Sequence, residues 1–216
     1  MARAKVTIEE PQCIRTGALT FFKMNDEWVV RRGYSSLPQS ERKRLKTEYQ
    51  ATWRNLQRVW KAFGGELKGT FEFREGRQLD YHKFLSLNLN PPVVTLTEEQ
   101  AEKGQTLAGP YWVSQGSVQP AVDVRIEDGM FLSNLRPEAL RRNEQVRFVL
   151  LQQMSGGWVA GRVIPLKSSQ FTLHNGCIAM PWSEGQWGTF VRVRQRRDKN
   201  LEVTTQRLVG QMNTEK

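Results

Sequence analysis

The chain has 216 residues, of which 38% are hydrophobic and 25% charged, a composition typical of a globular protein rather than a disordered chain. Its 32 Lys and Arg outnumber its 22 Asp and Glu, which leaves a net charge of +10. This surplus favours polyanionic partners such as nucleic acid or an acidic protein face, although charge of this size also serves solubility alone.

The first predicted element is a β-hairpin within residues 17–32. Residues 19–23 and 28–30 are rich in strand-forming side chains, and Asn25-Asp26 between them favours a turn. Gly33 ends the second predicted strand.

A long amphipathic helix is predicted next, up to Phe63. Ser36-Leu37-Pro38-Gln39 is typical of a helix start, and Gly64-Gly65 is typical of a helix end. Apolar residues recur at spacings of three and four and predict one buried stripe, formed by Leu45, Tyr49, Trp53, Leu56, Val59, Trp60 and Phe63.

The same helix is basic outside its apolar stripe, with seven Lys and Arg against only Glu41 and Glu48. One interpretation is a positive face that lies along phosphates, and the other is a solvated outer face whose long stems cover the flanks of the stripe. The candidate phosphate contacts on this helix are Arg42, Lys43, Lys46, Arg54, Arg58 and Lys61.

Short elements fill the middle of the chain. Residues 70–73 alternate like a strand, and Asp80 is the expected N-cap of a short helix that ends near Leu87. Thr97-Glu98-Glu99-Gln100 is a capping-box pattern. We expect a domain boundary near Pro91-Pro92, between a basic hairpin-and-helix domain at 1–92 and a β-rich domain at 93–216.

From Tyr111 onward the patterns predict mostly strands. Residues 144–151 and 158–164 flank a Ser-Gly-Gly turn, and residues 171–174 and 177–180 flank Asn175-Gly176, which suits a type I′ turn. A short helix is also expected around residues 136–142. The predicted fold class is therefore α+β, with a C-terminal antiparallel β-sandwich or small barrel.

Three arginines alternate along the predicted strand at residues 188–196. Arg192, Arg194 and Arg196 would share one face at intervals of about 6.6 Å, which is close to the spacing of successive phosphates in an extended nucleic-acid strand. The other interpretation is an ordinary strand with Val inward and Arg outward, paired with Glu202 across the hairpin.

Recognisable catalytic and metal-binding patterns are missing from the sequence. His174 and Cys177 have an H-x-x-C spacing that a tight turn explains, so we expect no metal and no cofactor. No nucleophile motif or phosphate-binding loop occurs, and we expect the protein not to be an enzyme. Carboxylates are plentiful but no pattern pairs two of them, and a glycosidase or nuclease stays an open alternative.

The expected location is the cytoplasm, without membrane association. Residues 1–19 hold no apolar signal segment, and no stretch approaches the roughly 18 apolar residues that span a bilayer. The two cysteines have no framework spacing, which fits a reducing compartment.

A likeness to known sequences lies in residues 17–32 with the helix that follows, and in segments 80–88, 113–117 and 201–206. Together these segments resemble an uncharacterised family of small proteins, a domain of unknown function common in Bacteroidetes. The resemblance implies a helical front half and a β-sandwich back half, and it implies no activity.

Two functions of different classes follow from these patterns. The first is a nucleic-acid-binding protein, for RNA or DNA, that contacts the phosphate backbone through the basic helix and the three arginines. The alternative is a structural subunit of a phage-like or other assembly, with protein partners or copies of itself at its strand edges. A carbohydrate-binding module with tryptophan platforms is disfavoured, because most of the 7 Trp fall at predicted core positions.

Overall fold

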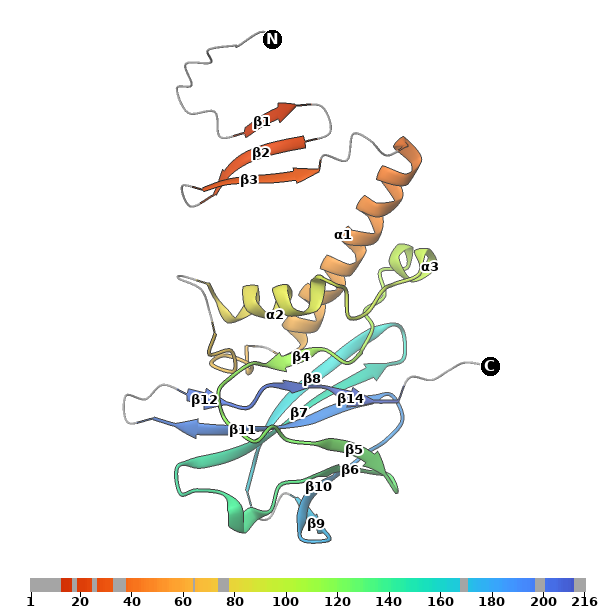
Figure 1. Cartoon of the computed structure of the whole chain (residues 1–216). Coiled ribbons are helices and arrows are strands. Elements are labelled where there is room, and N and C mark those ends of the chain that lie inside the picture. Colours follow the sequence, from red (N-terminus) through yellow and green to blue (C-terminus); the bar gives the residue numbers. More distant parts are fainter. Residues whose placement is uncertain are drawn as a thin grey trace. The chain divides into compact units, whose positions relative to one another are not determined.

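The computed structural model describes residues 13–16, 19–24, 27–32, 38–63, 65–73, 78–167, 171–196 and 201–211. The protein is α+β, with few helices and mostly antiparallel sheets (Figure 1). It forms two compact units, Met1–Thr47 and Glu48–Lys216. The division expected between residues 92 and 93 falls within the second unit.

Three strands form an antiparallel sheet in the first unit. They are β1 (Cys13–Thr16), β2 (Leu19–Met24) and β3 (Glu27–Arg32), in the order β1-β2-β3. β2 and β3 cover the two segments for which the sequence predicts paired strands, and β1 has no counterpart in that prediction. The expected turn at Asn25-Asp26 and the expected helix start at Ser36 lie outside the described residues.

Helix α1 (Gln39–Ala62) begins in the first unit and continues into the second. In the second unit its Leu56 and Val59, and Phe63 just beyond its end, are buried at the spacing that the sequence shows. Gly65 follows with a φ of +81°, a conformation that glycine adopts without strain. The predicted stripe is wrong at Tyr49, whose residue surface is 50% exposed.

Two short helices follow in the middle of the chain. In α3 (Glu98–Glu102) the Thr97 hydroxyl accepts from the Gln100 N–H and the Gln100 side chain accepts from the Thr97 N–H, which confirms the capping box. α2 (Asp80–Leu89) begins at Asp80, so the N-cap is Leu79 and the expected capping role of Asp80 is wrong. The Asp80 carboxylate instead accepts a hydrogen bond from the Gly69 N–H at 3.0 Å.

The larger sheet of the second unit has five antiparallel strands in the order β12-β11-β7-β8, with β14 also paired to β11. The strands are β7 (Glu144–Met154), β8 (Trp158–Leu166), β11 (Gln186–Gln195), β12 (Leu201–Val203) and β14 (Val209–Gly210). The pairing of β7 with β8 confirms the hairpin predicted around the Ser-Gly-Gly turn.

A second antiparallel sheet has the order β5-β6-β10-β9. Its strands are β5 (Val124–Glu127), β6 (Met130–Ser133), β9 (Thr172–His174) and β10 (Cys177–Pro181). Asn175 and Gly176 join β9 to β10 with φ values of 51° and 76°, which confirms the predicted hairpin. A short ladder pairs β4 (Trp112–Ser114) with β13 (Gln206–Arg207), and the helix expected at 136–142 is only a 3-10 turn, Pro137–Ala139.

Two hydrophobic clusters cover opposite faces of the five-stranded sheet. Alternate residues of β7 and β11, such as Val149 and Val191, join a cluster that α1 and α2 complete, which we call the first cluster. The intervening residues, such as Phe148 and Phe190, join a second cluster with Phe131 of the four-stranded sheet. The ring centroid of Phe148 lies 5.3 Å from the ring centroid of Phe131 and 4.9 Å from that of Phe190. The back half therefore has the layered core of a sandwich.

The close approach of these rings explains one glycine. A Cβ at Gly188 would lie 2.7 Å from Cζ of Phe148 and 2.9 Å from Cζ of Phe131. Only glycine therefore leaves room at this point of β11 for both rings.

Candidate nucleic-acid interface

The candidate cations of α1 divide between the two units. Lys43 and Lys46 are exposed in the first unit, and Arg42 belongs to the helix, although its side chain lies outside the described part of the structure. The Lys43 carbonyl accepts a hydrogen bond from the Thr47 hydroxyl at 2.9 Å, a bond within the helix that leaves the Lys43 ammonium uninvolved.

In the second unit, three exposed cations form one row along α1, and we call this row the cation row. Arg54, Arg58 and Lys61 follow each other at intervals of four and three residues, which places them on one face of a helix. That face is turned away from the buried Leu56 and Val59. The only acidic residue between 48 and 62 is Glu48, so this part of the helix has a local surplus of positive charge.

One member of the cation row has a partner within the fold. A guanidinium nitrogen of Arg58 donates to the carbonyl of Gly104, just after α3. For Arg54 and Lys61, by contrast, the described part of the structure contains no ion pair. Their charges are therefore available to a ligand without breaking an internal contact.

Arg192 and Arg194 of β11 are more buried than the outward-facing arginines that alternation predicts, and Arg196 lies just beyond the end of the strand. Both faces of β11 are covered, because Val191 and Val193 join one cluster while the neighbouring positions turn toward the other. Arg192 and Arg194 lie on the second face, with side chains only 10% and 24% exposed, whereas the Arg196 side chain is 57% exposed.

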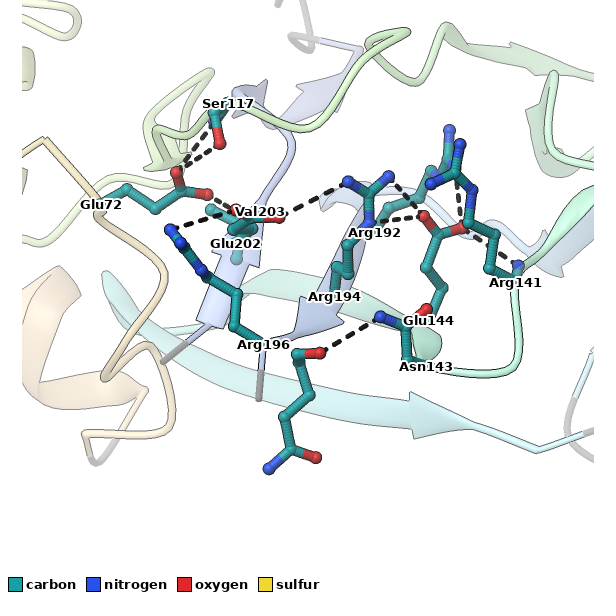
Figure 2. A network of polar contacts seen from close by, with 11 residues as sticks. Glu72, Ser117, Arg141, Asn143, Glu144, Arg192, Arg194, Arg196, Glu202 and Val203 are labelled. Atoms are coloured by element: carbon teal, nitrogen blue, oxygen red, sulfur yellow. Dashed lines mark hydrogen bonds and ion pairs between the residues drawn. The ribbon is translucent and has the colours of Figure 1, made fainter. Parts of the chain in front are cut away.

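Glu144, at the start of β7, binds two of these arginines (Figure 2). Arg192 Nη2 donates to one carboxylate oxygen at 2.8 Å, and Arg194 donates to the other from Nε at 3.0 Å and from Nη2 at 2.8 Å. The carboxylate oxygens of Glu202 on β12 lie 3.5 Å from Nη1 of Arg194 and 3.4 Å from Nη1 of Arg196. Two carboxylates thus compensate most of the charge of the three arginines.

The electrostatics of Glu144 follow from this arrangement. Its side chain is fully buried, and burial alone raises a carboxyl pKa. The hydrogen bonds from Arg192 and Arg194 and from the Arg141 N–H outweigh burial and lower the pKa of Glu144 to about 2. Glu144 is therefore ionised at neutral pH, and its arginine contacts are charge-assisted.

A second contact network, at a partly exposed site, joins segments that are far apart in the sequence. The Glu72 carboxylate accepts hydrogen bonds from the Ser117 N–H and hydroxyl, at 3.1 and 2.7 Å, and from the Val203 N–H (Figure 2). Sequence reasoning missed both Glu72 and Glu144. The only signal for Glu144 was its position at the start of a predicted strand, and nothing local indicates its partners 48 and 50 residues away.

An aromatic pair lies on the second-unit part of α1. The rings of Tyr49 and Trp53 are stacked, with centroids 6.4 Å apart and planes 28° apart. Trp53 is half-buried and packs against the first cluster, while Tyr49 is exposed. We call Tyr49 and Trp53 the aromatic pair.

His174 and Cys177 lie opposite each other across the β9–β10 turn, as the tight-turn interpretation requires. Within the described ranges no group of three or more His, Cys, Asp or Glu side chains could hold a metal ion. Of the helices that the structure describes, none is long and apolar enough to cross a membrane.

Comparison of the chain with protein-family models, curated proteins and solved structures finds no match. The likeness to a Bacteroidetes family therefore stays a prediction. The case for a function depends on the side chains themselves.

Proposed function

We propose that this protein is a non-catalytic binding protein that contacts the phosphate backbone of nucleic acid through α1. The observation that carries the proposal is the cation row, in which Arg54, Arg58 and Lys61 are all exposed. Neighbours in this row are about 4.5 to 6 Å apart along the helix axis, a spacing that lets each cation approach a different phosphate. A whole-chain charge of +10 supports the same partner through long-range attraction.

In this proposal the β11 arginines stabilise the fold, and they do not bind phosphates. A phosphate that drew Arg192 or Arg194 away would leave Glu144 buried without its compensating charges. Leaving a buried charge without its partner costs about 3 to 5 kcal/mol, which opposes such a rearrangement. Among the residues that the structure describes, the cation row makes one polar contact, from Arg58 to Gly104, so it carries no comparable penalty.

The test is the salt dependence of oligonucleotide binding, measured by fluorescence anisotropy. We expect the logarithm of the association constant to fall linearly with the logarithm of salt concentration, because bound cations displace counterions. The double substitution Arg54→Gln/Lys61→Gln removes two contacts, and for a single strand it lowers the magnitude of the slope by about 1.4.

The matched control is Arg125→Gln/Arg136→Gln, which removes the same charge from exposed positions at or near the four-stranded sheet. The control should leave the salt slope close to that of the parent protein. Binding that does not weaken with salt, or an equal loss in both double variants, would overturn the proposal.

A structural or assembly role remains the second candidate, and one observation favours it. β9 is an edge strand whose three residues are all exposed, and Leu173 in its centre is 60% exposed. An exposed strand edge with a large apolar side chain is a site for pairing with another strand. Light scattering over a concentration series distinguishes the assembly role from the nucleic-acid-binding role. Assembly through β9 predicts an average molar mass that rises with protein concentration, and the Leu173→Lys variant should not show this rise.

A further inference from the structure

The second-unit part of α1 presents three kinds of side chain in adjacent rows. Successive residues of a helix are about 100° apart around its axis, which confines the cation row to a sector about 60° wide. Gln50 and Gln57, both exposed, occupy the next sector. The aromatic pair lies beyond the glutamines, at the edge where the helix meets the core.

The aromatic pair is held in place by the fold and is still accessible. Trp53 packs against the first cluster on one side, and Tyr49 stacks on it with half of its surface exposed. A single exposed ring needs no explanation, because folded proteins expose many apolar atoms. A stacked pair packed against the core, on the same helix as a row of cations, is a more specific arrangement, and it matches the platforms on which proteins stack bases.

The glutamines between the two rows supply the polar groups that base edges require. Each exposed side-chain amide has two donor hydrogens and one acceptor oxygen. A strand with its phosphates on the cation row and its bases directed toward the aromatic pair passes over these amides. The order of the rows, cation then amide then aromatic, is the order of phosphate, base edge and base face in one nucleotide strand.

Base stacking on this surface requires an unpaired strand. In a duplex the base faces are covered by their neighbours, whereas unpaired bases can turn out and stack on aromatic side chains. A duplex laid on α1 would engage the cation row alone. We therefore infer, resting on the function proposed above, that the protein prefers single-stranded nucleic acid, whose phosphates bind the cation row while a base stacks on the aromatic pair.

The probe that isolates stacking is a short oligothymidylate compared with an abasic strand of the same length and charge. We expect the abasic strand and a duplex to bind about tenfold more weakly than oligothymidylate at equal salt. Tyr49→Leu should remove most of that difference, and Tyr49→Phe, which keeps the ring, should restore it. Trp158→Leu is the control, because Trp158 is 52% exposed on β8 and lies outside the proposed surface.

The possible outcomes separate the inference from the function on which it depends. Equal binding of abasic strand, duplex and oligothymidylate, with a normal salt slope, overturns the single-strand preference and leaves the phosphate-contact function standing. No salt-dependent binding of any probe overturns both. An unchanged preference in a folded Tyr49→Leu protein, with its helical circular dichroism intact, also overturns the role of the aromatic pair.

Discussion

At the scale of single residues, Glu144 has the largest predicted effect on stability. Its buried carboxylate holds Arg192, whose side chain is only 10% exposed, and Arg194. Removal of one partner from a buried ion pair leaves the other charge uncompensated in a medium of low polarity. The contacts of Glu144 with the two arginines therefore add little net stability to the fold, but loss of one partner destabilises it strongly.

We predict that Glu144→Gln lowers the free energy of unfolding at pH 7 by about 3 kcal/mol, measured by urea denaturation. The matched control is Glu127→Gln, which breaks the exposed contact with Arg125 at 3.1 Å. That exposed pair should change stability by less than about 1 kcal/mol. A loss in Glu144→Gln no larger than in the control would refute the assignment.

The pKa of Glu144 predicts how the free energy of unfolding changes in acid. Its folded pKa of about 2 lies below its ordinary value of 4.5, so ionised Glu144 stabilises the fold above about pH 4.5, and this contribution is lost as the pH falls toward 2. The difference in unfolding free energy between the parent protein and Glu144→Gln should therefore shrink between these pH values. A difference that stays constant down to pH 2 would contradict the depressed pKa.

At the scale of elements, the β9–β10 turn shows how two residues determine the backbone conformation of a hairpin. Asn175 and Gly176 both have positive φ, and a Cβ at Gly176 would meet nothing within 4 Å. The predicted cost of Gly176→Ala is therefore a backbone cost alone, about 1 kcal/mol of unfolding free energy by thermal or urea denaturation. Gly188→Ala is the steric counterpart and should cost more, because its Cβ would meet two phenylalanine rings.

Elements that depend on neighbouring residues were predictable from the sequence, including the capping box of α3 and the two hairpins around Gly-containing turns. Elements that depend on distant residues were not. Asn88 on α2, for example, donates to the Trp112 carbonyl at 3.1 Å and accepts from the Trp112 N–H at 2.8 Å, so a side chain pairs with β4 as a strand would. No local pattern indicates such a contact.

The candidate site divides in the same way. The exposed cations of the second-unit part of α1 follow from helical periodicity, because the polar positions of an amphipathic helix point outward. The β11 arginines do not follow from strand alternation, since alternation identifies two faces without showing whether both are covered. Here both faces of β11 are covered. The predicted alternative, outward arginines paired with Glu202, is confirmed for the Glu202 contacts of Arg194 and Arg196, but it did not include a fully buried Glu144 as a second partner.

At the scale of the whole molecule, β7 and β11 are shared between two cores. Leu151 and Val193 contribute to one cluster, and Val146 and Phe190 contribute to the other, through alternate positions of the same two strands. Residues of α1 and α2 and residues of the back half are therefore parts of one packed structure within the second unit.

This sharing limits how the chain can be cut for experiments. A fragment that begins at residue 93 would retain strands β4 to β14 but lose α1 and α2, and with them the cover over Val149, Leu151 and Val191. The uncovered sheet face would be a continuous apolar surface, which is a cause of aggregation in truncated proteins. A cut near residue 47, between the two compact units, leaves both clusters complete and is the better choice for an isolated β-rich domain.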